Sequence, residues 1–176
     1  DARKKNNIHH VYTLDFSTNI RLKLPEPKDY LYKEIRVDKY LESPPVIVGF
    51  GPCGMFAALI LAEAGYRPIV IERGSAIEDR VYKVERFWTK GILDTECNVQ
   101  FGEGGAGTFS DGKLTSGIKD PRKRKVLESF VRFGANPEIM YEQKPHIGTD
   151  VLRGIVKNLR NRIIELGGKV LFDTKL

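Results

Sequence analysis

The chain has 176 residues, 41% of them hydrophobic and 30% charged, and this mixture excludes a disordered tail or a collagen-like fibre. Its 29 Lys and Arg residues outnumber 23 Asp and Glu residues, but the net charge of +6 is too dispersed to indicate a nucleic-acid ligand by itself. No apolar run approaches the roughly 20 residues that cross a bilayer, and only two cysteines occur, so we expect a cytoplasmic protein without a membrane span.

The opening of the chain is predicted to form a small α+β segment. Ile8–Phe16 contains β-formers throughout and predicts a strand, and Arg21–Leu24 alternates charged and apolar residues as a second short strand would. Lys28–Leu41 is predicted to be a short helix or an irregular arm. A Pro-Pro pair at positions 44–45 then interrupts the chain. We therefore divide the chain into an N-terminal segment, residues 1–44, and a second domain, residues 45–176.

The second domain begins with a strand, a helix and another strand. Val46–Val48 is a short apolar strand, and Gly54–Ala64 is rich in good helix formers and is stopped by Gly65. Pro68–Ile71 predicts the second strand, and Glu72 follows it directly. This order predicts an α/β fold, in which a Rossmann-like βαβ domain carries a parallel sheet flanked by helices.

Further helices and one more strand are predicted after this unit. Ser75 and Glu78 have the spacing of a capping box for a helix that runs to about Lys90. The glycine-dense stretch Asn98–Lys119 has little periodicity and indicates an extended functional loop. Asp120 and Pro121 are typical of the start of a helix, which is expected to end near Gly134.

The clearest helix of the sequence lies near its end. Thr149 or Asp150 is expected to cap it, and Gly167-Gly168 ends it. One face carries apolar residues at helical spacing, namely Leu152, Ile155, Val156, Leu159, Ile163 and Leu166. Lys169–Phe172 is then predicted to be a further strand of the sheet.

The turn after the first strand carries the strongest functional signal. Gly49-Phe50-Gly51-Pro52-Cys53-Gly54 matches G-x-G-x-x-G, and its place between a strand and a helix is typical of a dinucleotide-binding unit. The first glycine allows the tight turn, the second has no Cβ to block a pyrophosphate, and the third allows close packing of the helix on the sheet. The N-terminus of the helix offers unpaired N–H groups to the phosphates.

Glu72 is the acidic residue that this motif requires at the tip of the second strand. Its carboxylate is predicted to accept hydrogen bonds from both hydroxyls of an adenosine ribose, whereas a 2′-phosphate there would meet a like charge, which disfavours NADP. The alternative is a glycine-rich turn beside a surface glutamate. These residues predict an adenine dinucleotide, and they do not choose between NAD and FAD.

A second glycine-rich stretch, residues 99–114, has glycines interleaved with hydroxyl and charged groups. Such a backbone suits close contact with a planar or anionic ligand, and its consecutive N–H groups are expected to form an anion-binding nest. Lys113 is a candidate for stabilising negative charge on a reduced flavin. The alternative is a flexible linker.

Two stretches carry a family resemblance, VIVGFGPCGMFAALILAEAGYRPIVIERG and NVQFGEGGAGTFSDGKLTSGIKD. Together they resemble the FAD-dependent dehydrogenase family, largely uncharacterised bacterial flavoproteins of the glutathione-reductase-like class with two dinucleotide-binding domains. The resemblance spans nearly the whole chain, and its second motif is the more specific one. It implies FAD rather than NAD at the first site, with the second glycine loop beside the pyrophosphate and flavin and the backbone of Val170 beside the adenine.

The cofactor-binding residues that this resemblance implies are Gly49, Phe50, Gly51, Pro52, Cys53, Gly54, Glu72, Arg73, Gly104, Gly105, Ala106, Gly107, Thr108, Ser110, Asp111, Gly112, Lys113 and Val170. Members of the family are much longer than this chain. They continue into a segment that commonly carries a Gly-Asp pair and closes over the ribityl side of the flavin, and into most of the substrate pocket. We therefore expect the chain to be a fragment that lacks the start and the second half of the family's sequence.

Other residues that carry chemistry are interpreted more simply. Cys53 is a candidate reactive thiol at a helix N-terminus, or only a small residue that fits the turn. His9, His10 and His146 do not have metal-ligand spacing, so no metal site is predicted. The basic run at residues 122–125 indicates a solvated helix face or a contact with RNA or an acidic partner.

The sequence thus leaves three functional hypotheses open. The first is an FAD-dependent oxidoreductase of unknown substrate, in which no catalytic base is predicted within this stretch. The second is a flavin- or nucleotide-dependent protein that modifies or binds RNA, although no aromatic residues interleave with the basic run and nucleic acid is not the expected partner. The third is a nucleotide-binding module without turnover.

Overall fold

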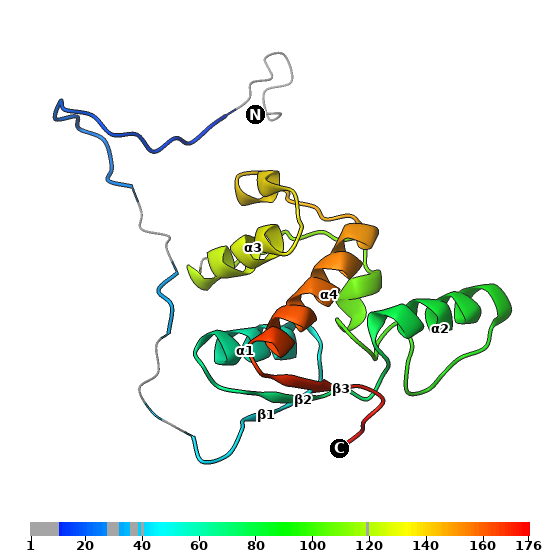
Figure 1. Ribbon diagram of the computed structural model, residues 1–176. Helices are drawn as coiled ribbons and strands as arrows, with labels where there is room; N and C mark the ends of the chain where they lie inside the picture. Colours follow the sequence, from blue (N-terminus) through cyan, green and yellow to red (C-terminus); the bar gives the residue numbers. More distant parts are fainter. Residues whose placement is uncertain (1–10, 28–31, 36–38, 40, 119) are drawn as a thin grey trace. The chain divides into compact units, whose positions relative to one another are not determined.

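The computed structural model describes residues 11–27, 32–35, 39, 41–118 and 120–176. Contacts within the chain divide it into two units, Asp1–Tyr30 and Leu31–Leu176. The second unit contains the helices and strands assigned in the described residues (Figure 1).

The described part of the first unit, residues 11–27, has no helix or strand. The prediction of a strand over Ile8–Phe16 is therefore wrong for residues 11–16, and residues 8–10 lie outside the described part of the chain. The predicted strand Arg21–Leu24 is also wrong. Alternation alone does not make a strand, because an extended segment needs a partner strand to bond its backbone.

Residues 28–41 were expected to be a short helix or an irregular arm. Residues 32–35, 39 and 41 have no helix, and the rest of the predicted range 28–41 lies outside the described residues. The Tyr66 hydroxyl donates to the Lys39 carbonyl oxygen at 3.0 Å, and the Lys125 ammonium lies 5.2 Å from the centre of the Tyr32 ring. Both arm residues lie within the second unit, which begins at Leu31, whereas we predicted a boundary at the Pro-Pro pair 44–45.

A parallel sheet of three strands forms the base of the second unit (Figure 1). Its strands are β1, Val46–Val48, β2, Ile69–Ile71, and β3, Lys169–Leu171, in the order β1-β2-β3. The central residues Ile47, Val70 and Val170 are in register across the sheet. All three strands were predicted, and the α/β fold with a parallel sheet is confirmed.

Four α-helices and two short 3₁₀ helices are assigned in the described residues. They are α1, Pro52–Glu63, α2, Ile77–Lys90, η1, Ala106–Phe109, α3, Arg122–Arg132, η2, Pro137–Met140, and α4, Thr149–Glu165. The four α-helices match the predicted ones within a few residues, whereas η1 and η2 were not predicted. Within the described residues, no helix has both the length and the apolarity that a membrane span requires.

The core lies between the sheet and the helices that cover one of its faces. Figure 1 shows α1 and α4 on this face, with α3 beyond them. The predicted apolar face of α4 is confirmed, since Ile155, Val156, Leu159 and Ile163 are buried and Leu152 and Leu166 pack against the same cluster. On the opposite face of the sheet, Val46 and Val48 are exposed.

Tertiary contacts replaced the local capping that was predicted for α2. Its N-cap is Ala76, and the Ser75 hydroxyl donates to Asp173 Oδ1 at 2.7 Å, so the capping-box interpretation of Ser75 and Glu78 is wrong. The Ile77 N–H instead donates to Glu103 Oε2 at 2.7 Å, a residue 26 positions away. A buried carboxylate on another segment thus supplies the acceptor that the helix start needs.

Two other helix starts differ slightly from the prediction. Pro121 is the N-cap of α3, and Asp120 Oδ1 accepts the Arg122 N–H at 2.8 Å. Gly148, one residue before the expected Thr149 or Asp150, is the N-cap of α4.

Candidate functional site

The first glycine turn lies at the carboxyl end of β1 and leads into α1. Gly49 has a φ of +90°, which favours glycine, and its N–H donates to the Ile71 carbonyl oxygen at 2.7 Å. A Cβ on Gly54 would overlap the Gly49 carbonyl oxygen and lie 3.4 Å from Ile47 Cγ2. Gly54 is thus required both by the turn itself and by the approach of the helix to the strand.

Gly51 lies where the motif predicts a pyrophosphate, and the second glycine loop packs beside it. Gly51 is the N-cap of α1 with a φ of −76°, and the heavy atom nearest to a Cβ at this position would be Gly105 Cα, at 3.9 Å. Pro52 and Cys53, which follow it, are exposed. Pro52 has no N–H group, so the N–H donors of the first turn of α1 belong to the exposed Cys53 and the half-buried Gly54.

The Glu72 carboxylate faces this turn and is almost completely buried, with 5% of the residue exposed. Its Oε2 accepts the Phe50 N–H at 2.7 Å, and its Oε1 accepts the N–H groups of Gly74 at 2.9 Å and Gly102 at 3.0 Å. A carboxylate has about four acceptor positions, so three of them are filled by the protein. One acceptor position, on Oε2, takes no hydrogen bond from the described residues, whereas we had expected this carboxylate to accept from two ribose hydroxyls.

The first part of the second glycine loop packs directly on the first turn. Residues 102–105 are buried, and the Gly104 N–H donates to the Phe50 carbonyl oxygen at 2.9 Å. The Glu103 N–H donates to the Ser75 oxygen and the Gly105 N–H to the Gly102 oxygen. Together with the Gly102 N–H on Glu72, these bonds use the amide groups within the protein. The anion-binding nest expected in this part of the loop is therefore not formed.

The second part of the loop is more accessible. Ala106, Ser110 and Asp111 are exposed and Gly107 is half-buried, whereas Thr108 is buried and its hydroxyl donates to the Glu103 carbonyl oxygen at 3.3 Å. Gly112 has a φ of +70°, and a Cβ there would overlap the Ile147 carbonyl oxygen.

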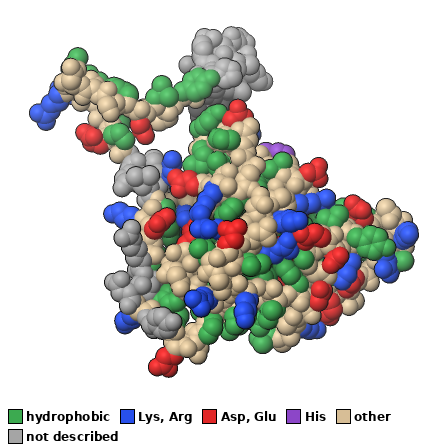
Figure 2. Space-filling view, in the orientation of Figure 1, with side chains coloured by type: hydrophobic (Ala, Val, Ile, Leu, Met, Phe, Trp, Pro, Cys, Tyr) green, Lys and Arg blue, Asp and Glu red, His purple; other side chains and the backbone are tan. Residues whose placement is uncertain are grey.

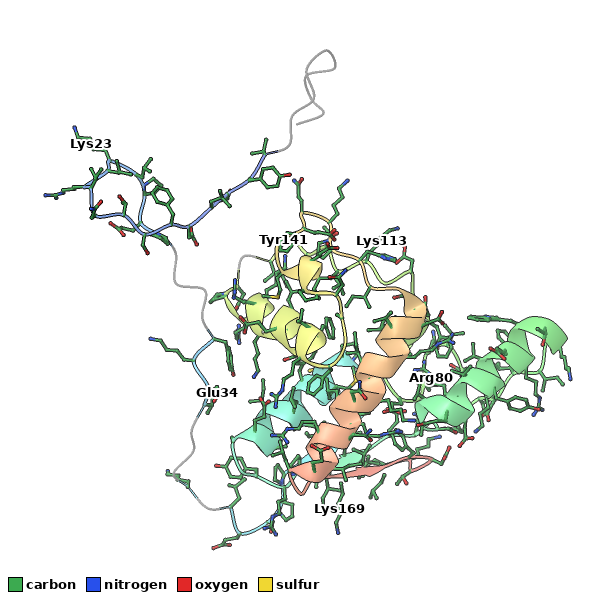
Figure 3. The ribbon with its side chains drawn as sticks, turned by 45° about the horizontal axis from the view of Figure 1, so that its top comes forward. Lys23, Glu34, Arg80, Lys113, Tyr141 and Lys169 are labelled. Carbon is green, nitrogen blue, oxygen red and sulfur yellow. The ribbon has the colours of Figure 1, made fainter. Side chains whose placement is uncertain are left out.

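Lys113 lies near the N-terminal end of α4 (Figure 3) and is exposed. Its ammonium pairs with Asp111 Oδ2 at 2.6 Å, and this hydrogen bond raises the pKa of Lys113 and lowers that of Asp111. Lys113 also forms an isolated backbone bridge with His146. The charge that was predicted to stabilise a reduced flavin is thus already paired with the Asp111 carboxylate.

Arg73 and Val170 occupy different surroundings. The Arg73 guanidinium lies 4.4 Å from the centre of the Phe101 ring and 3.9 Å from a Glu96 carboxylate oxygen. Val170 is the middle residue of β3 and packs against the core. The residue that pairs with the Glu72 carbonyl oxygen from the β3 side is Thr174, through its N–H at 3.0 Å.

Three charged residues contact one another or the glycine loop and were not predicted from the sequence: Arg80, Glu103 and Arg160. Arg80, on α2, is fully buried, and burial lowers its pKa to about 10. Glu103, also fully buried, accepts from Arg160 at 2.8 Å, and burial raises its pKa. The available signal was the position of Arg80 between Ile77 and Val84, the other two buried residues of α2, at helical spacing.

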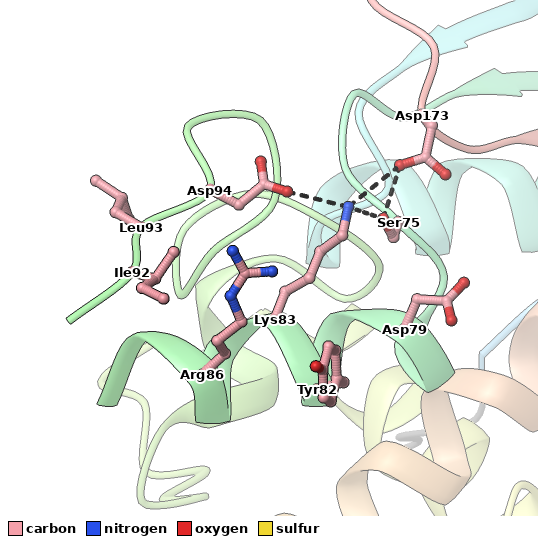
Figure 4. A pocket seen from close by; sticks show the side chains of 9 residues that line it. All are labelled: Ser75, Asp79, Tyr82, Lys83, Arg86, Ile92, Leu93, Asp94 and Asp173. Carbon is pink, nitrogen blue, oxygen red and sulfur yellow. Dashed lines mark hydrogen bonds and ion pairs between the residues drawn. The ribbon is translucent and has the colours of Figure 1, made fainter. Parts of the chain in front are cut away.

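A pocket of about 490 Å³ lies beside this region, between α2, the residues 92–94 that follow it, and the segments that follow β2 and β3 (Figure 4). The Lys83 ammonium lies 2.9 Å from the Ser75 hydroxyl, 3.1 Å from Asp94 Oδ2 and 4.0 Å from Asp173 Oδ1. Burial opposes the charge of Lys83, but the hydrogen bond to Asp94 and the nearby negative charges together outweigh it and raise the pKa of Lys83. A lysine held in its charged form is a poor general base, so Lys83 does not activate the Ser75 hydroxyl as a nucleophile.

The basic run at residues 122–125 is largely neutralised. Arg122 pairs with Asp120 at 2.6 Å, Arg124 with Glu128 at 2.8 Å and Lys125 with Glu63 at 2.9 Å. Figure 2 likewise shows blue and red side chains interspersed on the visible face. These ion pairs weaken the argument for RNA binding, because cations that bind phosphates must be free to replace the counter-ions of the nucleic acid.

Both cysteines are free thiols. Cys97 is buried and its sulfur accepts the Ser75 N–H at 3.3 Å, whereas Cys53 is exposed in the glycine turn.

No protein-family model matches the chain. It is 50% identical over 190 residues to a protein of Clostridium beijerinckii (strain ATCC 51743 / NCIMB 8052) described as an "Uncharacterized protein". This match covers 100% of the chain and 35% of that protein, so the chain spans about a third of the length of this relative.

Proposed function

We propose that this chain forms the part of an FAD-dependent oxidoreductase that binds the ADP half of FAD on a Rossmann-like parallel sheet. One observation carries the proposal: the buried Glu72 carboxylate, at the tip of β2, is bonded to the Phe50 N–H inside the glycine turn that begins α1. This hydrogen bond brings together the Glu72 carboxylate, which would bind the ribose, and the N-terminus of α1, which would bind the pyrophosphate.

The residues present fit the ADP moiety of such a cofactor. Gly51 has no Cβ to block a phosphate, and Cys53 and Gly54 supply N–H donors in the first turn of α1. The free acceptor position on Glu72 Oε2 suits one ribose hydroxyl, and its negative charge disfavours a 2′-phosphate at the same place.

FAD, when bound, would supply the hydride or electron transfer, and the chain would bind and orient it. The exposed residues Ala106, Ser110 and Asp111 are the members of the second loop that remain accessible to a ligand. The substrate, the electron donor and acceptor, and the catalytic residues belong to the whole protein and are not assigned to this chain.

FAD titration of the purified protein tests the proposal, with ADP as a competitor. We expect flavin binding with the visible absorbance of an oxidised flavoprotein, and competition by ADP because the ADP half makes the contacts proposed here. A protein that binds neither FAD nor ADP would refute the proposal.

A matched pair of glycine variants sharpens this test. Gly51 and Gly148 are both N-cap glycines with negative φ, and a Cβ on either has space. Gly51→Ala should weaken FAD binding about tenfold, because its methyl group occupies the place of the pyrophosphate, whereas Gly148→Ala should leave it unchanged. Equal affinities for the two variants would contradict the proposed place of the pyrophosphate.

A nucleotide-binding module without turnover makes the same binding predictions. Reduction of the bound flavin by NADH or NADPH, followed by reoxidation over many turnovers, distinguishes the enzyme from the module.

A further inference from the structure

Arg80 carries a buried positive charge whose hydrogen-bond partners are all backbone carbonyl groups. The residue is fully buried, and its guanidinium forms no ion pair within the described residues, although the charges of Glu72 and Glu103 favour its charged form. A fully buried arginine without a charged partner is unusual and costly. The guanidinium donates to the carbonyl oxygens of Asn98 at 3.0 Å, Val99 at 3.0 Å, Gly102 at 3.2 Å, Glu103 at 2.5 Å and Gly105 at 2.9 Å.

These carbonyl groups belong to one segment, residues 98–105, which forms the start of the second glycine loop. On its other side the same segment offers N–H groups to the first turn and its acid. The Gly102 N–H donates to Glu72 Oε1 at 3.0 Å, and the Gly104 N–H donates to the Phe50 oxygen at 2.9 Å. The loop is thus held between a cation on its carbonyl side and an anion on its amide side.

The contact between Arg80 and the loop leaves no spare room. Gly102 has a φ of +113°, and a Cβ there would lie 2.5 Å from Arg80 Cδ. The Arg80 guanidinium also lies 4.8 Å from the centre of the Phe109 ring, whose centre is 4.9 Å from the Arg153 guanidinium. The Trp88 ring meets Phe109 edge-on at 5.9 Å. Arg80, labelled in Figure 3, therefore contacts both the start of the loop and η1 in its middle.

We propose that Arg80 is a positioning residue of the adenine-dinucleotide site, which acts by holding the second glycine loop against Glu72 and the first turn before any ligand binds. Through Gly102 it orients the Glu72 carboxylate, and through Gly105 it sets the space over Gly51. The identity of the ligand rests on the proposed function, whereas the positioning of the loop is a property of the ligand-free chain.

Hydrogen exchange of the ligand-free protein tests the positioning directly. The amides of Gly102 and Gly104 should be strongly protected in the wild type. Arg80→Lys should speed their exchange about tenfold or more while leaving the core amides of α4 unchanged, because a lysine ammonium has too few donors to bond all of these carbonyl groups at once. Arg86→Lys, an exposed position on the same helix, is the matched control and should change neither. Unprotected glycine amides in the wild type, or unchanged exchange in Arg80→Lys, would overturn the proposal.

FAD affinity supplies the second measurement. Arg80→Lys should bind FAD about tenfold more weakly than wild type, because the site must then be ordered at the moment of binding. In Arg80→Ala, added methylguanidinium should restore affinity and amide protection, whereas methylammonium should not, a rescue that a general loss of stability would not show. Failure of the rescue together with a lowered global stability would reduce Arg80 to a structural residue and refute the positioning role.

The two proposals fail separately. If the wild type binds neither FAD nor ADP, the proposed function is wrong, and the exchange of Gly102 and Gly104 still decides whether Arg80 holds the loop. If the Arg80 variants do not fold, Phe109→Leu removes the ring between Arg80 and Arg153 and should raise loop exchange in the same direction, and no rise would contradict the proposal.

Discussion

Replacing Glu72 by glutamine tests how far the site is built around one carboxylate. The substitution keeps the size of the side chain and exchanges one acceptor oxygen for an NH₂ group that only donates. In the folded protein the carboxylate accepts three backbone N–H groups, from Phe50, Gly74 and Gly102. A glutamine that keeps its oxygen on Gly74 and Gly102 must turn its NH₂ group toward the Phe50 N–H.

The expected cost follows from these contacts. Hydrogen bonds to charged groups contribute about 1.5–3 kcal/mol and neutral ones about 0.5–1.5 kcal/mol, and a buried donor left without an acceptor costs about 1–3 kcal/mol. One bond is lost and two are weakened, and the easier burial of a neutral amide offsets part of this. We expect Glu72→Gln to lower the free energy of unfolding by about 3 kcal/mol.

Urea unfolding measures this difference, as a lower midpoint with an unchanged slope. The exposed Glu85, on α2, provides the control, because no side-chain contact of its carboxylate is found in the described residues and Glu85→Gln should change stability by less than about 0.5 kcal/mol. A loss below about 1 kcal/mol for Glu72→Gln would show that the carboxylate does not hold the turn and the loop together, and the reasoning would be refuted.

Two more predictions concern neighbouring parts of the site. Gly74→Ala places a Cβ 2.5 Å from Gly102 Cα, and this overpacking, about 1–3 kcal/mol, should lower the melting temperature by several degrees. Gly117→Ala is the control, because a Cβ there meets nothing within 4 Å and should leave the melting temperature unchanged. Equal melting temperatures for the two variants would contradict the packing of Gly74 against Gly102. The hydrogen bond from Arg160 lowers the pKa of Glu78 from 4.5 to about 2, so the stability it contributes is present above pH 4.5 and is lost as the pH falls toward 2. Glu78→Gln should therefore lose less stability than wild type across this range in acid titrations followed by circular dichroism, and parallel curves would disprove the contribution.

The helices and strands of the second unit follow from local patterns. The apolar spacing on α4 predicts both the helix and its buried face, because a helix with one apolar stripe has only one side to bury. The glycine turn and Glu72 were predicted to lie together for a similar reason, since the tips of adjacent parallel strands meet at one edge of the sheet.

Predictions that depended on contacts between segments far apart in the sequence were wrong in two cases. The Ser75 capping box was wrong because Glu103, far along the chain, supplies the acceptor for α2. The strands of the N-terminal segment were wrong in the described residues because the alternating pattern says nothing about a partner strand.

The amino-acid sequence by itself determined which short segments are helix, strand or glycine turn in the second unit, because those choices depend on side chains a few positions apart. Only the tertiary structure decided that N–H groups of the second glycine loop donate to Glu72 and Phe50 and that its carbonyl groups accept from Arg80. Backbone groups are the same in every residue, so their partners depend on which segments the fold brings together, and that information is not local.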